Sequence, residues 1–219
     1  VGGYYLGQYP FDWHEFDPLS GLSDEAVVVV VNGNSPWKTL DDLIKEMKAR
    51  PGQLSWGYTG AGNSTHLTAE GVGRAAGAKF RGVPFNGGSD VRTALLGGHI
   101  DVACLTGGEA WSYHEAGKLR ILASSLPTKS AVLPGIPTLR ELGVDFDLIL
   151  WKGLFVPKGT PDTIKETLCT AIEKAVRDKE YVALMENIRA DVSYIHYKDY
   201  EKFLVEQDKF MKDILTELN

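Results

Sequence analysis

Short runs of β-branched residues alternate along this chain with longer segments whose apolar residues recur at helical spacing. Ala26–Val31 is a β-branched run typical of a buried strand, and a turn-forming stretch, residues 32–36, follows it. Residues 40–47 then carry apolar side chains at positions i, i+3, i+4 and i+7, and Arg50-Pro51-Gly52 ends that pattern. This part of the chain therefore predicts a strand, a turn and a helix in immediate succession.

The same succession of strand, loop and helix recurs through the first two thirds of the chain. Further strands are expected at Leu54–Tyr58, Phe80–Pro84, Ile100–Leu105 and Leu119–Ser124. The helices between them are expected at about Ser64–Ala76, Asp90–Leu96 and Glu109–Ala116. Because units of this length imply strands that run parallel, the pattern predicts an α/β fold, with a mostly parallel sheet and helices on both of its faces.

The pattern changes in the last third and is absent from the beginning. Proline and glycine concentrate in residues 127–137, where we expect a domain transition. A long apolar run, Phe146–Val156, precedes three helical patterns, of which the first spans about Asp162–Arg177 and the last about Lys198–Leu218. Residues 1–25 are rich in aromatic side chains without periodicity, so we expect an irregular packed segment there.

The composition is that of a globular chain and excludes several classes of function. The 219 residues include 23 Lys and Arg against 29 Asp and Glu, and no basic cluster suits a nucleic acid or an anionic membrane. The longest apolar run is far shorter than the roughly 18 residues that a membrane span needs. Cys104 and Cys169 have neither a CxxC spacing nor a nearby histidine, so we expect two buried thiols.

The strongest candidate for a binding site is the glycine-rich stretch Gly57–His66, between a predicted strand and a predicted helix. Its glycines let a ligand approach the backbone, and Asn63, Ser64 or Thr65 can cap the helix. Free N–H groups at a helix N-terminus form a site for a carboxylate or a phosphate. The stretch has neither the lysine of a Walker motif nor the glycine spacing of a dinucleotide fingerprint. Taken alone, it is also compatible with a tight turn needed only for packing.

Two further loops have the same build. Pro84–Asp90 precedes a predicted helix that Ser89 or Asp90 can cap, and Thr106–Glu109 precedes another. The carboxyl ends of parallel strands meet at one edge of the sheet, which is where ligands bind in open α/β folds. The convergence of three such loops therefore favours a binding site at that edge.

A second hypothesis is a hydrolase built on Ser64 and His66. The chain lacks a Gly-x-Ser-x-Gly elbow, an HExxH motif and any cluster of histidines and carboxylates at metal-ligand spacing. We therefore expect no catalytic residue, no metal and no cofactor, and keep the Ser/His hydrolase as an alternative.

Six short motifs occur in a fixed order along the chain. They are Ser35–Leu40 (SPWKTL), Tyr58–Leu67 (YTGAGNSTHL), Val83–Asp90 (VPFNGGSD), Leu95–Asp101 (LLGGHID), Leu133–Thr138 (LPGIPT) and Gly153–Pro161 (GLFVPKGTP). The series resembles the substrate-binding receptors of tripartite tricarboxylate transporters, the Bug-type extracytoplasmic solute receptors of bacteria. The resemblance covers about residues 26–219.

The resemblance implies a periplasmic-binding-protein fold of the second type, in which two lobes with mostly parallel sheets close on a small organic acid. It implies that backbone N–H groups, small polar side chains and waters hold a mono- or dicarboxylate. The ligand-binding residues it implies are Thr59, Gly60, Ala61, Asn63, Ser64, His66, Gly87, Gly88, Ser89, Thr106 and Gly107. Thr106 and Gly107 match less well, because the family often has an acidic residue near Thr106.

The resemblance also implies a cellular role without catalysis. The receptor would deliver its ligand to the integral membrane subunits of a tripartite transporter, and would bind no nucleic acid. It would be periplasmic or extracytoplasmic, either soluble or lipid-anchored, with the signal segment absent from this chain. Which organic acid it binds stays open.

One departure from the family pattern concerns the first lobe. Family members open with a strand and a Pro-Phe-x-x-Gly-Gly loop that forms one jaw, and no such segment is found here. We therefore expect an incomplete lobe 1, from residues 1–31 and 151–219, beside a lobe 2 at residues 32–150. A LysR-like effector-sensing domain, which has a related two-lobed fold, is a further alternative.

Overall fold

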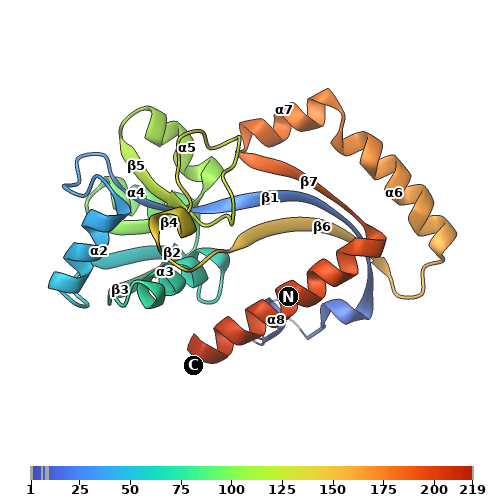
Figure 1. Ribbon diagram of the computed structural model, residues 1–219, viewed down its shortest axis with the longest axis horizontal. Coiled ribbons are helices and arrows are strands. Elements are labelled where there is room, and N and C mark those ends of the chain that lie inside the picture. Colours follow the sequence, from blue (N-terminus) through green and yellow to red (C-terminus); the bar gives the residue numbers. More distant parts are fainter. Residues whose placement is uncertain (1, 6, 8–9, 219) are drawn as a thin grey trace. The chain divides into compact units, whose positions relative to one another are not determined.

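The computed structural model describes residues 2–5, 7 and 10–218, and the chain divides into two compact units (Figure 1). Unit 1 consists of Val1–Asp24, Trp151–Asn187 and Asp191–Asn219. Unit 2 consists of Glu25–Leu150 and Ile188–Ala190. Neither unit is a single continuous piece of the chain.

Unit 2 contains a sheet with strand order β3-β2-β4-β1-β5. The sheet is formed by β2 (Ser55–Thr59), β3 (Arg81–Phe85), β4 (Val102–Thr106), β5 (Leu119–Ser124) and β1 (Phe16–Asn32), of which residues 16–24 belong to unit 1. Strand β2 runs parallel to both β3 and β4, whereas β1 runs antiparallel to β4 and β5. The predicted α/β fold with a mostly parallel sheet is thus confirmed, with β1 as the antiparallel member.

The centre of this sheet explains the run of valines in the sequence. Val27–Val31 are all fully buried in β1, between β4 and β5. A strand covered on both faces needs apolar side chains at successive positions, which is why the run does not alternate. Each buried valine contributes roughly 1.5–3 kcal/mol relative to an exposed one.

The helices of unit 2 lie where the strand–loop–helix pattern predicts them, although those expected to begin at Asp90 and Glu109 each begin two residues earlier. They are α2 (Leu40–Ala49), α3 (Ser64–Ala75), α4 (Gly88–Leu96) and α5 (Gly107–Glu115), with a short 3₁₀ helix η2 (Arg140–Leu142) after them. A reciprocal capping box starts α2, in which Thr39 Oγ1 accepts from the N–H of Asp42 and the Asp42 carboxylate accepts from the N–H of Thr39.

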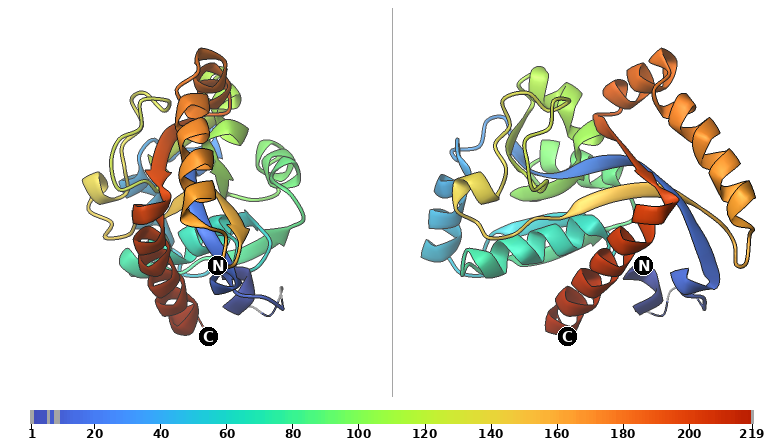
Figure 2. Two further views of the ribbon diagram at one scale, coloured as in Figure 1. Left: turned by 90° about the vertical axis from the view of Figure 1, so that its right-hand side faces the viewer. Right: turned by 45° about the vertical axis from the view of Figure 1, so that its right-hand side comes forward.

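Unit 1 is built around helix α8 (Tyr197–Leu218). The other elements are α1 (Gly2–Tyr5), the 3₁₀ helix η1 (Trp13–Glu15), β6 (Ile149–Pro157), α6 (Asp162–Val176), α7 (Lys179–Asn187) and β7 (Ala190–His196). Tyr200 and Leu204 of α8 are fully buried against Trp13. Helix α1 lies beside α8 (Figure 2), and the Tyr5 hydroxyl donates to Asp208 at 2.8 Å. None of the described helices is long and apolar enough to cross a bilayer.

Two expectations about secondary structure are wrong. Residues 1–25 were expected to be irregular, but β1 already begins at Phe16 and runs for 17 residues. Pro18 and Gly21 interrupt any alternation there, and pairing of β1 with β6 and β7 overrides their low strand propensity. No strand was expected at Ala190–His196, where β7 lies. Tyr9, another aromatic residue of the segment, lies outside the described residues.

Candidate functional site

The carboxyl ends of β3, β2 and β4 meet at one edge of the sheet of unit 2. The three strands are neighbours and run parallel, and the strand ends Thr59 and Phe85 stand opposite one another. The N–H of Gly60, just after β2, donates to the carbonyl oxygen of Phe85 at 3.0 Å. The predicted convergence of the three loops is therefore confirmed.

The first loop joins β2 to α3 through a threonine pair. Thr65 Oγ1 accepts from the N–H of Thr59 at 3.0 Å and lies 2.8 Å from Thr59 Oγ1. Gly60 and Gly62 have φ of +57° and +76°, the left-handed region that favours glycine. These contacts fix the end of the strand against the first turn of the helix.

The N-terminus of α3 has no side-chain cap. Asn63 is the N-cap residue, but its side chain makes no capping hydrogen bond, and Thr65 bonds back to Thr59 instead. The N–H groups of the first turn are therefore available, together with the positive end of the helix dipole. Of the three residues that the sequence suggested as caps, Asn63 occupies the N-cap position, but its side chain makes no capping hydrogen bond.

His66 supports the loop by accepting a hydrogen bond from the backbone. Its Nδ1 accepts from the N–H of Gly62 at 3.0 Å, so the ring is neutral there and carries its proton on Nε2, which lies 3.8 Å from Glu70 Oε1. Burial lowers the pKa of His66, while the charge of Glu70 opposes that shift. The ring also packs against Tyr58, with centroids 4.4 Å apart.

Ser64 and His66 do not form a nucleophile–base pair in this structure. Residues two apart on a helix do not face each other, and His66 Nδ1 is already engaged with the Gly62 N–H. A general base must lie within hydrogen-bond reach of the hydroxyl that it activates. Ser64 is therefore a residue of the first helical turn, and His66 is a hydrogen-bond acceptor that stabilises the loop.

The second loop also leaves a helix N-terminus without a side-chain cap. The expectation that Ser89 or Asp90 caps α4 is wrong, because the N-cap residue is Gly87 and no side chain caps the helix. The helix begins at Gly88, so Ser89 and Asp90 lie within its first turn and not at the N-cap position before it. Gly87 is in an extended conformation, with φ of −157°.

The third loop differs from the other two because its helix is capped by the chain itself. Thr106 Oγ1 accepts from the N–H of Glu109 at 3.4 Å, and Glu109 Oε2 accepts from the N–H of Thr106 at 3.0 Å. A Cβ added to Gly108 would lie 2.5 Å from the carbonyl oxygen of Ile188, and Gly107 is buried. The first turn of α5 is therefore closed by a capping box and by the backbone of residues 188–189.

The residues expected to bind a ligand differ in exposure. Those that are exposed are Ala61, Asn63 and Ser89. Those that are half-buried are Thr59, Gly60, Ser64, His66, Gly87 and Thr106. The buried ones are Gly88 and Gly107. The described residues contain no group of histidines, cysteines and carboxylates that could hold a metal ion.

Two residues at or near these loops, Glu109 and Arg189, were not proposed as site residues from the sequence. The Thr-x-x-Glu spacing of Thr106 and Glu109 is a capping-box signature and could have identified Glu109. Arg189 carries no such signal, because its place beside α5 depends on contacts between distant parts of the chain. Both thiols, Cys104 and Cys169, are buried and free, as expected.

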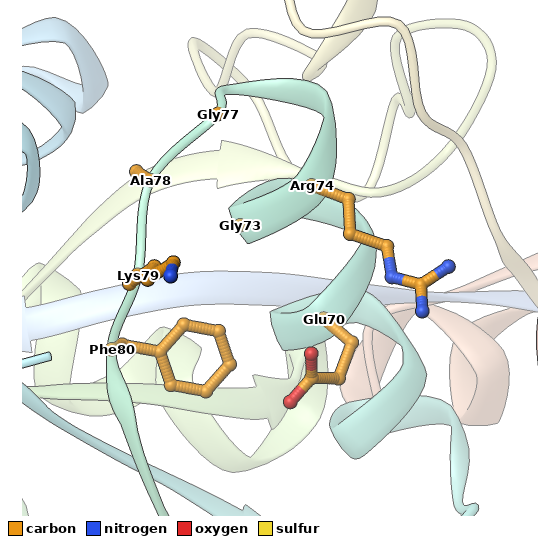
Figure 3. Close-up of a pocket in the computed structure, with 7 residues that line it drawn as sticks. All are labelled: Glu70, Gly73, Arg74, Gly77, Ala78, Lys79 and Phe80. Carbon is orange, nitrogen blue, oxygen red and sulfur yellow. The ribbon is translucent and has the colours of Figure 1, made fainter. Parts of the chain in front are cut away.

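A surface pocket of about 450 Å³ lies at the other end of α3. In Figure 3 the Phe80 ring and the Glu70 carboxylate face the gap between α3 and the chain that follows it, and Arg74 points away. The other lining residues are Gly73, Gly77, Ala78 and Lys79. The pocket is separate from the edge at which the glycine-rich loops meet.

Residues 3–219 match the family model described as the tripartite tricarboxylate transporter family receptor, TctC. The chain belongs to this family. It is 36% identical over 201 residues to a UPF0065 protein in the gbd 5′ region of Cupriavidus necator, covering 91% of this chain and 61% of that protein. It is 31% identical over 166 residues to the protein BugT of Bordetella pertussis, covering 75% of this chain and 51% of BugT. The chain thus spans about half to three fifths of the length of these relatives.

Solved structures share the fold. A TctC solute-binding protein from Polaromonas, solved without ligand, has a TM-score of 0.85 and 26% identity, covering 98% of this chain and 74% of that chain. MatC from Rhodopseudomonas palustris, solved with bound malate, has a TM-score of 0.76 and 23% identity, covering 91% of this chain and 69% of that chain. The fold is therefore that of the periplasmic solute-binding proteins of this family.

Proposed function

We propose that this protein is an extracytoplasmic solute-binding receptor that captures a small organic carboxylate, a mono- or dicarboxylate, and delivers it to the integral membrane subunits of a tripartite transporter. Membership of the receptor family supports the role. The observation that carries the ligand class is that α3 and α4 follow the neighbouring strands β2 and β3 and that neither of their N-cap residues makes a side-chain cap hydrogen bond.

The chemistry of the two loops favours an anion held by the backbone. Their sequences, residues 57–66 and 84–90, contain no lysine or arginine. Free N–H groups and the dipoles of two helices supply partial positive charge at the point where the loops meet. A carboxylate oxygen accepts several such hydrogen bonds at once, whereas a neutral sugar gains nothing from the dipoles.

We assign the ligand contacts to the residues that the family resemblance implies. The backbone N–H groups and hydroxyls of the first loop would bind one carboxylate, and those of the second loop would share it. The proposed set is Thr59, Gly60, Ala61, Asn63, Ser64, His66, Gly87, Gly88, Ser89, Thr106 and Gly107. Because α5 already has its own cap, we expect the third loop to contribute less.

We propose further that the loops belong to the second of two lobes. The lobes would consist of residues 32–150 and of residues 1–31 with 151–219. The division of the structure supports this proposal, since Glu25–Leu150 forms the continuous part of unit 2. All three loops lie within that stretch.

Titration calorimetry of the full-length protein tests the ligand class. The panel should hold mono- and dicarboxylates, with malate among them because a structure of the same fold contains it, and neutral sugars of similar size. Acids should bind and sugars should not. Micromolar binding of a sugar, together with no detectable binding of any acid, would contradict the proposal. Turnover of ester substrates that Ser64→Ala abolishes would favour the hydrolase instead.

A further inference from the structure

Glu70 lies one helical turn after His66 on α3, outside the glycine-rich loops. Its Oε1 is 3.8 Å from His66 Nε2, and the side chains of Glu70 and His66 are only 31% and 18% exposed. Residues four apart on a helix share a face, so the helix itself brings this carboxylate to the ring. Nε2 is the ring nitrogen that carries the proton, because Nδ1 accepts from the N–H of Gly62. A negative charge therefore faces the N–H of a neutral imidazole.

The position of the proton on this ring decides whether the first loop keeps its hydrogen bond. Nδ1 accepts from the Gly62 N–H at 3.0 Å, and Gly62 has the left-handed φ of +76°. In the other neutral tautomer a proton on Nδ1 would face that N–H, and two donors would meet. The conformation of the loop at Gly62 thus depends on the proton staying on Nε2.

Among the described groups beside the ring, Glu70 is the one that favours a proton on Nε2. The Tyr58 ring packs against His66 with centroids 4.4 Å apart, and burial raises the pKa of the Tyr58 hydroxyl, so this group is neutral near pH 7. The guanidinium of Arg74, one turn further along α3, points away from the Glu70 carboxylate (Figure 3). A carboxylate beside one ring nitrogen commonly fixes the tautomer of a histidine whose other nitrogen is engaged.

We propose that Glu70 is a positioning residue for the ligand site: it keeps the His66 proton on Nε2, so that Nδ1 holds the Gly62 N–H and the first loop keeps its shape. The inference rests on the proposed function and adds to it a residue that acts through His66 and not by touching the ligand. Without Glu70 the loop would sample conformations that lack the Gly62 bond. Ligand binding would then also have to order the loop, and affinity would fall.

Two substitutions of Glu70 separate its charge from its acceptor oxygen. Glu70→Gln removes the charge but keeps an acceptor oxygen within reach of Nε2, whereas Glu70→Met removes both in a side chain of similar length and good helix propensity. Glu115→Met, at an exposed position at the end of α5, is the matched control. Circular dichroism should show the parental helix content in all three variants.

Nitrogen NMR of the His66 ring measures the tautomer without any ligand. At about pH 8, above the ordinary pKa of histidine, the parent and Glu70→Gln should carry the proton on Nε2, and Glu70→Met should show a mixture of the two tautomers. The charge of Glu70 raises the pKa of His66, so both substitutions should lower that pKa, which the same signals report. A proton that stays on Nε2 in Glu70→Met to the same extent as in the parent overturns the inference.

Calorimetry of the full-length protein with the acid that binds it best measures the consequence for binding. Glu70→Met should weaken binding about fivefold, the usual net worth of one hydrogen bond, while Glu70→Gln and Glu115→Met should stay within about twofold of the parent. Parental affinity in Glu70→Met despite a changed tautomer would overturn the link to the ligand site. Weaker binding in Glu70→Gln with the tautomer retained would show that Glu70 acts in another way, and would overturn the inference too. If no acid binds the parent, the proposed function fails, and the tautomers alone decide whether Glu70 positions the loop.

Discussion

The guanidinium of Arg189 lies 4.7 Å from the centroid of the Trp111 ring, on helix α5. Its Nη1 also donates to the carbonyl oxygen of Val132 at 3.3 Å. Arg189 is the one non-glycine residue in the described part of the chain with a positive φ, +56°. The side-chain contacts therefore hold a backbone conformation that an arginine would otherwise avoid.

Two substitutions of Arg189 should separate the stabilisation by its side-chain contacts from the cost of its left-handed backbone. Arg189→Ala loses the cation–π contact and the hydrogen bond but keeps the left-handed backbone, so we expect a loss of about 1–2 kcal/mol in the free energy of unfolding. Arg189→Gly loses the same contacts but relieves the backbone, and should be about 1–2 kcal/mol more stable than the alanine variant. Urea denaturation measures both. An alanine variant as stable as the parent would show that the stacking is energetically neutral.

The Ser64 hydroxyl is expected to contribute to acid binding without any chemical step. Ser64→Ala should weaken binding of the best acid by roughly 1–2 kcal/mol while the fold stays intact. Calorimetry gives the affinity and circular dichroism gives the fold. Ser112→Ala, an exposed serine on α5, is the control that should change neither. Unaltered affinity in Ser64→Ala would remove this hydroxyl from the site.

Gly60 and Gly77 form a matched pair for testing the first loop. Both have a left-handed backbone, with φ of +57° and +61°, so alanine at either position should lower the free energy of unfolding by about 1–2 kcal/mol. A Cβ on Gly60 would also lie 2.7 Å from Asn63 Nδ2, whereas nothing lies within 4 Å of one on Gly77. Calorimetry should therefore show weaker acid binding for Gly60→Ala and parental binding for Gly77→Ala. Equal affinities in the two variants would contradict the assignment of the site.

His66 should make stability depend on pH below neutrality. Burial lowers its pKa in the folded protein, so the unfolded chain takes up the proton more readily. Its contribution is then complete above the ordinary value of 6.5 and is lost as the pH falls from there toward the folded pKa. Protonation of Nδ1 would also break the bond from Gly62.

The comparison variant for this prediction is His66→Asn, whose side-chain oxygen can accept from the Gly62 N–H but does not titrate. Urea denaturation at about pH 7.5 and about pH 5 gives the loss of stability in each protein. The parent should lose more than the variant, since all other titrating groups are shared. A parallel pH dependence of the two proteins would show that His66 makes no net contribution.

Local signals in the sequence were sufficient to predict the helices of unit 2 and the edge of the sheet at which the three loops meet. Apolar periodicity and turn residues located α2 to α5, and the rule for parallel strands brought the three loops together. The caps were predicted less well, because Gly87 starts α4 earlier than Ser89 or Asp90 would. A shift of two residues at a helix end decides whether its N–H groups are free.

The missed features depend on contacts between residues far apart in the chain. The first half of β1 and all of β7 have weak strand patterns, and each is stabilised by pairing across long sequence separations. Arg189 adopts its conformation because Trp111 and Val132 meet its side chain. No window of local sequence contains both partners of these contacts.

The way the two units share the chain has a consequence for the order of folding during synthesis. Glu25–Leu150 leaves the ribosome as one piece, so the sheet of unit 2 can form early, before residues 188–190 are added to it. Tyr200 and Leu204, which close the core around Trp13, are among the later residues to be translated. Until then Trp13 lacks the two side chains that bury it in the core of unit 1.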